Sequence, residues 1–166
     1  MAESIEDYKT RILGYVGNQD PLLLQQQMEG KIDDLIRGVA PEKLLQRPLP
    51  GKWSVAEIIA HLADDELVGA YRIRLILSSP GTTIQSFDQD QWALQGKYND
   101  IAITTSLALF NELRKANLFL FSTLTPEQWQ MYGVHAERGK ETIQDIARYY
   151  AGHDINHLKQ IEAIIF

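Results

Sequence analysis

The sequence contains no cysteine among its 166 residues. This absence excludes disulfide bridges, thiolate zinc sites, iron–sulfur clusters and cysteine nucleophiles, and it fits a reducing compartment. A chain of this length buries enough apolar surface to fold without a disulfide or a structural metal. We therefore expect one domain over residues 1–166, in which residues 1–19 form a short N-terminal helical extension.

Long apolar runs and strongly basic segments are also missing. No stretch reaches the roughly 18 consecutive apolar residues of a membrane-spanning helix, and the N-terminal segment lacks the basic and then apolar pattern of a secretory signal. The net charge is −6, with acidic and basic residues interspersed, so no basic stripe is available to neutralise phosphates. We expect a cytoplasmic protein with no membrane and no nucleic-acid partner.

The sequence contains neither a serine in a GxSxG context nor a glycine-rich phosphate loop, which gives no support to a serine hydrolase or a nucleotide-binding protein. No segment alternates with a period of two, so we expect no sheet. Apolar residues instead recur at helical spacing between the prolines, with N-cap residues at the start of several segments. The predicted helices run from Asp20-Pro21 to about Gly38, from Ser54 to Ser78, from Ile101 to Thr123, and from Thr142 to the C-terminus.

A shorter amphipathic stretch, from Ile5 to Tyr15, precedes these helices. The segment from Thr82 to Asp100 is polar and reads as a long crossover loop with one helical turn at most. Four long helices joined by such a loop predict an all-α fold, a four-helix bundle with a long crossover between helices 2 and 3.

His153 and His157 are four residues apart on the last predicted helix. Residues at this spacing lie one turn apart on the same face, so both imidazoles can reach one metal ion. Ile146, Tyr150 and Ile161 share their stripe, which predicts that both histidines face the bundle interior. The alternative is a pair of core histidines that bind backbone groups or carboxylates and hold no metal.

His61 lies on the flank of the apolar arc of the second helix, where it can serve as a third ligand if helices 2 and 4 pack together. Taken alone, it reads as an ordinary surface histidine on a half-buried face. Asp65 lies one turn further along the same side. It can orient His61, act as a fourth ligand or serve as a base, whereas with Asp64 it can also be a solvated acidic patch.

Two glutamates of the second helix are poor candidates for ligands. Glu66 falls near the middle of the apolar arc, where an unpaired carboxylate is costly, so we expect a partner for it or a wet cleft around it. It points about 140° away from His61 around the helix, so the two cannot easily bind the same ion. Glu57 is explained by a capping box with Ser54.

The remaining polar candidates lie in the connections and on the last helix. His135 can gate a pocket or simply be exposed, and Asp88 and Asp90 can line a pocket from the crossover or be solvated there. Tyr150, one turn before His153, can place a polar tip at the pocket wall.

Three segments, taken in order, resemble the DinB-like superfamily, including its YfiT-like members proposed to be metal-dependent hydrolases. They are PGKWSVAEIIAHLADDE, FDQDQWA and GKETIQDIARYYAGHDINHLKQI, and the resemblance spans roughly residues 20–165. It implies a bundle of up-down-down-up connectivity with a metal held at one end by His61, His153 and His157. It also implies zinc or nickel as the divalent metal and a homodimeric assembly, in a superfamily that includes thiol-dependent S-transferases and a maleylpyruvate isomerase.

The leading hypothesis is a metal-dependent enzyme of the hydrolase or thiol S-transferase type. It acts on a small molecule between helices 2 and 4, with a low-molecular-weight thiol as the co-substrate of a transferase and Asp65 as the catalytic carboxylate. The first alternative is a non-catalytic small-ligand or protein-interaction bundle with a role in stress. The second is a helical scaffold whose apolar faces serve dimerisation.

Overall fold

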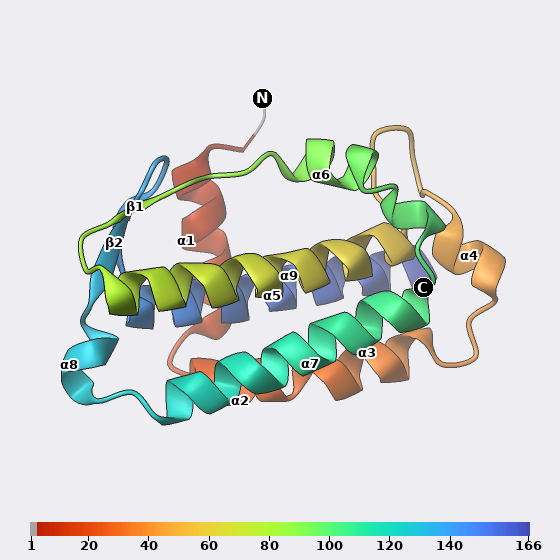
Figure 1. Ribbon diagram of the computed structural model, residues 1–166. Helices are drawn as coiled ribbons and strands as arrows, with labels where there is room; N and C mark the ends of the chain where they lie inside the picture. Colours follow the sequence, from red (N-terminus) through yellow and green to blue (C-terminus); the bar gives the residue numbers. More distant parts are fainter. Residues whose placement is uncertain (1–2) are drawn as a thin grey trace.

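The bundle consists of four helical arms (Figure 1). We obtained a computed structural model, which describes residues 3–166. The first and last arms run in one direction and the two between them in the other, so the connectivity is up-down-down-up. The predicted four-helix bundle is confirmed. The arms are α2 (Pro21–Gln26) with α3 (Met28–Ile36), α5 (Val55–Ser78), α7 (Ile103–Ser122) and α9 (Ile143–Ile165).

Capping residues start three of the arms where the sequence predicted. The Ser54 hydroxyl accepts from the Glu57 backbone N–H, and the Glu57 carboxylate accepts from the Ser54 N–H. Thr142 caps α9 with Asp145 in the same reciprocal way. Asp20 caps α2, with proline at the first helical position. These side chains satisfy backbone donors that the first helical turn leaves unpaired, which fixes where each helix begins.

The first arm is interrupted at Gln27, so the prediction of one continuous helix from Asp20 to Gly38 was wrong in detail. The backbone of Gln27 stays in the helical region, with φ −79° and ψ −11°, and α2 and α3 therefore continue in nearly one line. Two further short helices lie in segments read as connections. They are α4 (Pro41–Leu45) and α8 (Pro126–Trp129), and each begins with proline.

A small sheet contradicts the expectation of no strands. Its strands are β1 (Thr83–Ile84), β2 (Tyr132–His135) and β3 (Gly139–Thr142), with β1 parallel to β2 and β2 antiparallel to β3. Strands of two to four residues are too short to produce a readable alternation. The sheet joins the end of α5 to the start of α9 and holds His135 against the bundle.

The crossover from α5 to α7 runs along the bundle (Figure 1). After β1 it contains α6 (Gln89–Gln95), capped by Asp88, and a 3₁₀ turn η1 (Tyr98–Asp100) that packs on α5. It therefore holds more regular structure than the single turn that the sequence predicted.

Helix α1 (Ile5–Val16) crosses α9, and its place is set by Gly152. A Cβ at Gly152 would lie 2.4 Å from the carbonyl oxygen of Ile12, so only glycine permits this close approach. The predicted N-terminal helix is thus confirmed, and it packs as part of the fold.

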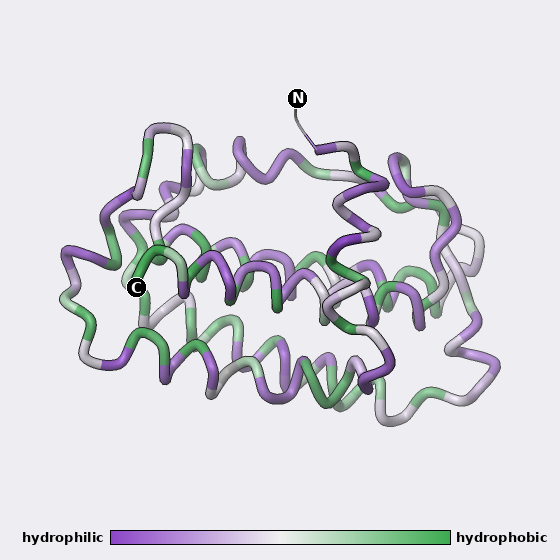
Figure 2. Tube along the Cα trace, turned by 180° about the vertical axis from the view of Figure 1, so that it is seen from behind, coloured by the Kyte–Doolittle hydropathy of each residue, from purple (hydrophilic) through white to green (hydrophobic). Residues whose placement is uncertain are grey.

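Apolar residues recur along the arms between polar ones (Figure 2). They pack into two main clusters, one around Ile59 and Phe110 and one around Ile76 and Ile146. Within residues 3–166, none of the helices combines the length and apolarity needed to cross a membrane.

Candidate metal centre

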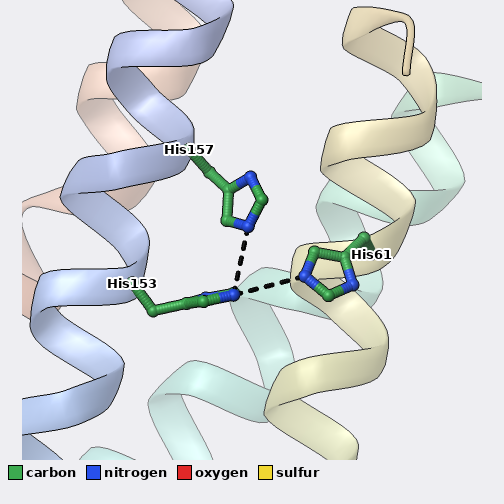
Figure 3. A group of neighbouring side chains, drawn as sticks. All are labelled: His61, His153 and His157. Atoms are coloured by element: carbon green, nitrogen blue, oxygen red, sulfur yellow. Dashed lines mark hydrogen bonds between the residues drawn. The ribbon is translucent and has the colours of Figure 1, made fainter. Parts of the chain in front are cut away.

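The three histidines named from the sequence meet between α5 and α9. Figure 3 shows the imidazole of His61 reaching from α5 toward those of His153 and His157 on α9. Nε2 of His153 lies 3.3 Å from Nε2 of His61 and 3.1 Å from Nε2 of His157. Their exposed fractions are 1%, 5% and 5%, so His61 is not the surface histidine of the alternative interpretation.

The separations of these nitrogens match those of ligands that share a tetrahedral metal. Zinc–imidazole bonds are about 2.0–2.1 Å long, which places two such nitrogens about 3.3–3.4 Å apart around one ion. The ligand atoms of the three histidines all lie within 4.8 Å of one another. Since Nε2 of His153 faces two other ring nitrogens, one N–H···N bond leaves the second pair unsatisfied, whereas a shared cation satisfies all three lone pairs.

The electrostatic environment keeps two of the imidazoles neutral. Burial lowers the pKa of His153 well below its usual value, and neighbouring His61 adds to the effect. Burial likewise lowers the pKa of His157, with a contribution from His153. A neutral imidazole is the form that binds a metal, so the site needs little proton release before it accepts a cation.

Polar partners on the far side of two rings fix which nitrogen faces the centre. Nδ1 of His153 lies 3.2 Å from Oδ2 of Asp65, and Nδ1 of His157 lies 2.8 Å from Oε1 of Gln160. Both acceptors favour a proton on Nδ1 and leave the Nε2 lone pair free. Asp65 is 3.7 Å from Nε2 of His61, so its nearest histidine is His153 and not the His61 that the sequence suggested.

The imidazole of His61 is held in place by packing against an aromatic side chain. The indole of Trp53 lies 4.8 Å from the His61 ring, centroid to centroid. Nδ1 of His61 is buried and has no hydrogen-bond partner within residues 3–166. This side of the ring is thus set by apolar contact, in contrast to His153 and His157.

Neither glutamate is part of the histidine cluster, as expected from the helical phase of Glu66 and the capping role of Glu57. Glu66 is buried and is partnered by Arg114 at 2.8 Å and by the side-chain amide of Asn117 at 3.0 Å, which confirms the expectation of a partner. Glu57 forms the capping box and also binds Arg47.

A cavity of about 430 Å³ opens beside the histidines. His153, His157, Asp65 and Tyr150 line one part of it, so the expected place of Tyr150 at the pocket wall agrees with the structure. A second cavity of about 450 Å³ lies between α9 and the connection that contains Trp53. His157 and Gln160 line both cavities, and Asp88 and Asp90 line the first and the second respectively.

Sequence reasoning missed Arg72 and Tyr8 of the first cavity, and it left the place of His135 open. Arg72 lies eleven residues after His61, three turns along and only about 20° around the helix, so its phase could have placed it on the histidine side of α5. His135 is buried in the cavity wall and not exposed in a loop, because β2 folds it against the bundle. Tyr8 reaches the cavity from α1, and no sequence pattern indicates this.

The fold and the site define a class of protein: a helical bundle with a buried three-histidine cluster beside an open cavity. The family model described as the DinB superfamily matches residues 26–161. The chain belongs to the DinB superfamily.

Known relatives agree with this assignment. A protein of Oceanobacillus iheyensis named "Putative metal-dependent hydrolase" is 26% identical over 132 residues, 80% of this chain and 76% of the relative. Another protein of that name and organism is 31% identical over 114 residues, 69% of this chain and 66% of the relative. The solved structure of YfiT from Bacillus subtilis, described as "a probable metal-dependent hydrolase with an unusual four-helix bundle topology", matches with a TM-score of 0.81 at 21% identity. That match covers 98% of this chain and 88% of YfiT and supports the fold.

Proposed function

We propose that the protein is a metal-dependent enzyme that acts on a small molecule in the cavity beside His61, His153 and His157. The observation that carries the proposal is the convergence of three buried Nε2 atoms at separations that suit one cation. The names of the relatives support it, because they describe metal-dependent hydrolases. Zinc and nickel are the metals we propose, since both accept imidazole ligands.

His61, His153 and His157 would hold a divalent cation, and that cation would supply Lewis acidity toward a water, a thiol or a carbonyl oxygen. The chain's own groups position and exchange protons around it. Asp65 holds His153 through Nδ1, and its side chain is 13% exposed on the cavity side of that contact. We assign Asp65 the role of proton acceptor in addition to that of positioning His153.

The reaction is of the hydrolase or the thiol S-transferase type. One observation supports a reaction with two small substrates, and the composition restricts the source of any thiol. The chain has no cysteine, so a sulfur nucleophile must come from a low-molecular-weight thiol. Two cavities of similar volume meet at His157 and Gln160, which gives each of two molecules a place beside the same centre.

An activity screen with metal removal tests the proposal. Protein purified without a polyhistidine tag is treated with a chelator, divided, and reloaded with zinc or nickel. Each sample is assayed with a panel of small esters and amides, and with thiols paired with an electrophile. We expect activity that the chelator abolishes and one metal restores. Activity that is indifferent to the chelator would overturn the proposal, as would a metal-loaded protein that is inert toward both panels and behaves as the non-catalytic bundle.

The proposed assembly is a cytoplasmic homodimer. Its support in the structure is the outer face of α5, where Leu67 and Tyr71 lie one turn apart with exposed fractions of 49% and 65%. Light scattering coupled to size exclusion measures the assembly. Substitution of Leu67 by lysine should shift a dimer toward the monomer, and a monomeric wild-type protein would contradict the assignment.

A further inference from the structure

The wall of the first cavity contains a buried arginine whose charge is not neutralised. Arg72 is 6% exposed and lines the cavity. Its Nη2 donates to the carbonyl oxygen of Gln85 at 2.7 Å, and its guanidinium lies 5.9 Å from the centroid of the Phe87 ring. Within residues 3–166, no carboxylate lies within ion-pair distance of it. A buried guanidinium without a counter-ion is costly, and it offers several unused donors.

The other charged groups of this cavity are already engaged or lie at its rim. Arg138 is paired with Glu141 through two hydrogen bonds of 2.7 and 2.9 Å. Glu3 binds Arg11 in the same bidentate way. Asp88 accepts the backbone N–H groups that begin α6.

The last two carboxylates do not neutralise Arg72 either. Asp65 lies against His153, and Glu137 is an exposed residue. Arg72 therefore keeps a positive charge in the cavity that a negatively charged ligand can neutralise.

His135 adds a second unpaired donor to the same wall. Its Nδ1 accepts the backbone N–H groups of Glu137 and Arg138 at 3.2 and 3.4 Å. A neutral imidazole has one protonated nitrogen, so these bonds place the hydrogen on Nε2. That nitrogen is buried and has no partner within the part of the chain that the structure describes. Burial lowers the pKa of His135 to about 4, and the positive charges of Arg138 and Arg72 add to the effect, so the ring is neutral near pH 7.

We infer that Arg72 and His135 form the binding site for a carboxylate group of the small-molecule substrate. The guanidinium fork matches the two oxygens of a carboxylate, and a charge-assisted pair of this kind is among the strongest polar contacts available to a protein. Since the same cavity contains His153 and His157, the anchored molecule presents another part of its structure to the histidine centre. This inference rests on the proposed function for its role in catalysis, but not for the binding itself.

The test measures carboxylate binding in the absence of metal, because a metal would itself bind carboxylates. Chelator-treated protein is titrated with sodium succinate and with uncharged succinamide at low ionic strength near neutral pH, and binding is followed by calorimetry or ligand-observed NMR. The wild type should bind succinate and not succinamide. Arg72→Gln should weaken the binding by about tenfold to a hundredfold, which is the loss of a charged hydrogen-bonding partner. His135→Phe should weaken it to a smaller extent.

Arg74→Gln is the matched control, because it removes the same charge two residues away at an exposed position of α5. It should leave succinate binding unchanged. Circular dichroism and zinc content report whether Arg72→Gln is folded and keeps its metal site. If it is unfolded, Arg72→Lys takes its place, and the loss of the planar fork should still weaken binding.

Equal succinate affinity in the folded Arg72 variant and the wild type would overturn the carboxylate site. The same holds if the wild-type protein binds succinate no better than succinamide. Either result leaves metal content untouched, so failure of this inference is distinguishable from failure of the metal centre.

Discussion

At the scale of residues, His153 joins the parts of the site, because its two ring nitrogens serve different partners. Nε2 faces His61 and His157 within 3.3 Å, and Nδ1 faces Asp65 at 3.2 Å. A carboxylate behind a metal-binding histidine fixes the ring and increases the basicity of the ligand nitrogen. We therefore propose that Asp65 affects metal affinity through His153.

Substitution of Asp65 by asparagine should weaken metal binding by about tenfold to a hundredfold, because the amide is a poorer acceptor for Nδ1–H. Competition with a chromophoric chelator measures the affinity. Asp64→Asn is the control, since it makes the same charge change at a residue that binds Tyr98. Equal affinity in the Asp65 variant and the wild type would show that this contact does not support the site.

The neutral state of His135 should make the stability of the metal-free protein pH-dependent. Its folded-state pKa of about 4 lies below the usual histidine value of 6.5, so the unfolded chain takes up the proton first as pH falls. The contribution of His135 is complete above pH 6.5 and is lost as pH falls toward 4, by at most about 1.4 kcal/mol per pH unit. Urea unfolding of wild type and His135→Gln over this range should give a shallower pH slope for the variant. Parallel slopes would contradict the assignment.

Arg114 joins two buried carboxylates across three helices. It donates to Asp154 at 2.7 Å and to Glu66 at 2.8 Å. Arg114→Met should cost about 3–5 kcal/mol of unfolding free energy, because two buried carboxylates lose their counter-ion. Chemical denaturation measures the loss. Glu112→Gln, which removes an exposed ion pair with Lys115 on the same helix, should change stability by less than about 1 kcal/mol.

Glu66 shows what the sequence could and could not predict about a single residue. Its position in the apolar arc predicted a partner, and the partner exists. The identity of that partner could not be predicted, because Arg114 lies 48 residues away on another helix.

At the scale of elements, α1 packs against α9 and contributes Tyr8 to the wall of the first cavity. Gly152→Ala would place a Cβ 2.4 Å from a backbone oxygen of Ile12, which cannot rotate away. We expect a loss of about 1–3 kcal/mol, typical of overpacking. Gly14→Ala is the control, because nothing lies within 4 Å of its Cβ position and alanine favours helix. Thermal unfolding of the pair should shift in opposite directions, and a neutral Gly152 variant would contradict the close packing.

The elements also show which features local sequence determines. Caps at Ser54 and Thr142, with apolar residues at helical spacing, were sufficient to predict α5 and α9. The sheet was not predictable in this way, because Thr83 pairs with Val134 about fifty residues away. The sequence left a pocket position and an exposed position open for His135, and the pairing of β2 with β1 and β3 buries it in the cavity wall.

At the scale of the whole molecule, the packing of α5 against α9 converts a weak spacing pattern into a site. Helical phase placed His153 and His157 inward and His61 on a flank, and the bundle then brought the three Nε2 atoms together. Arg72 lay in phase with His61 but was not recognised, because its meaning depends on the cavity that the crossover and α1 enclose. The fold could thus be predicted from the sequence more completely than the cavity residues that surround the histidines.

Metal analysis of tag-free protein tests the central claim most directly. Inductively coupled plasma mass spectrometry is applied to wild type, His153→Ala and His135→Gln, the last of which alters the one histidine outside the centre. We predict about one divalent cation per chain in wild type and in His135→Gln, because three converging imidazoles define one site. His153→Ala should retain less than about a tenth of it, since one of three ligands is lost. Equal metal content in His153→Ala and the wild type would contradict the account.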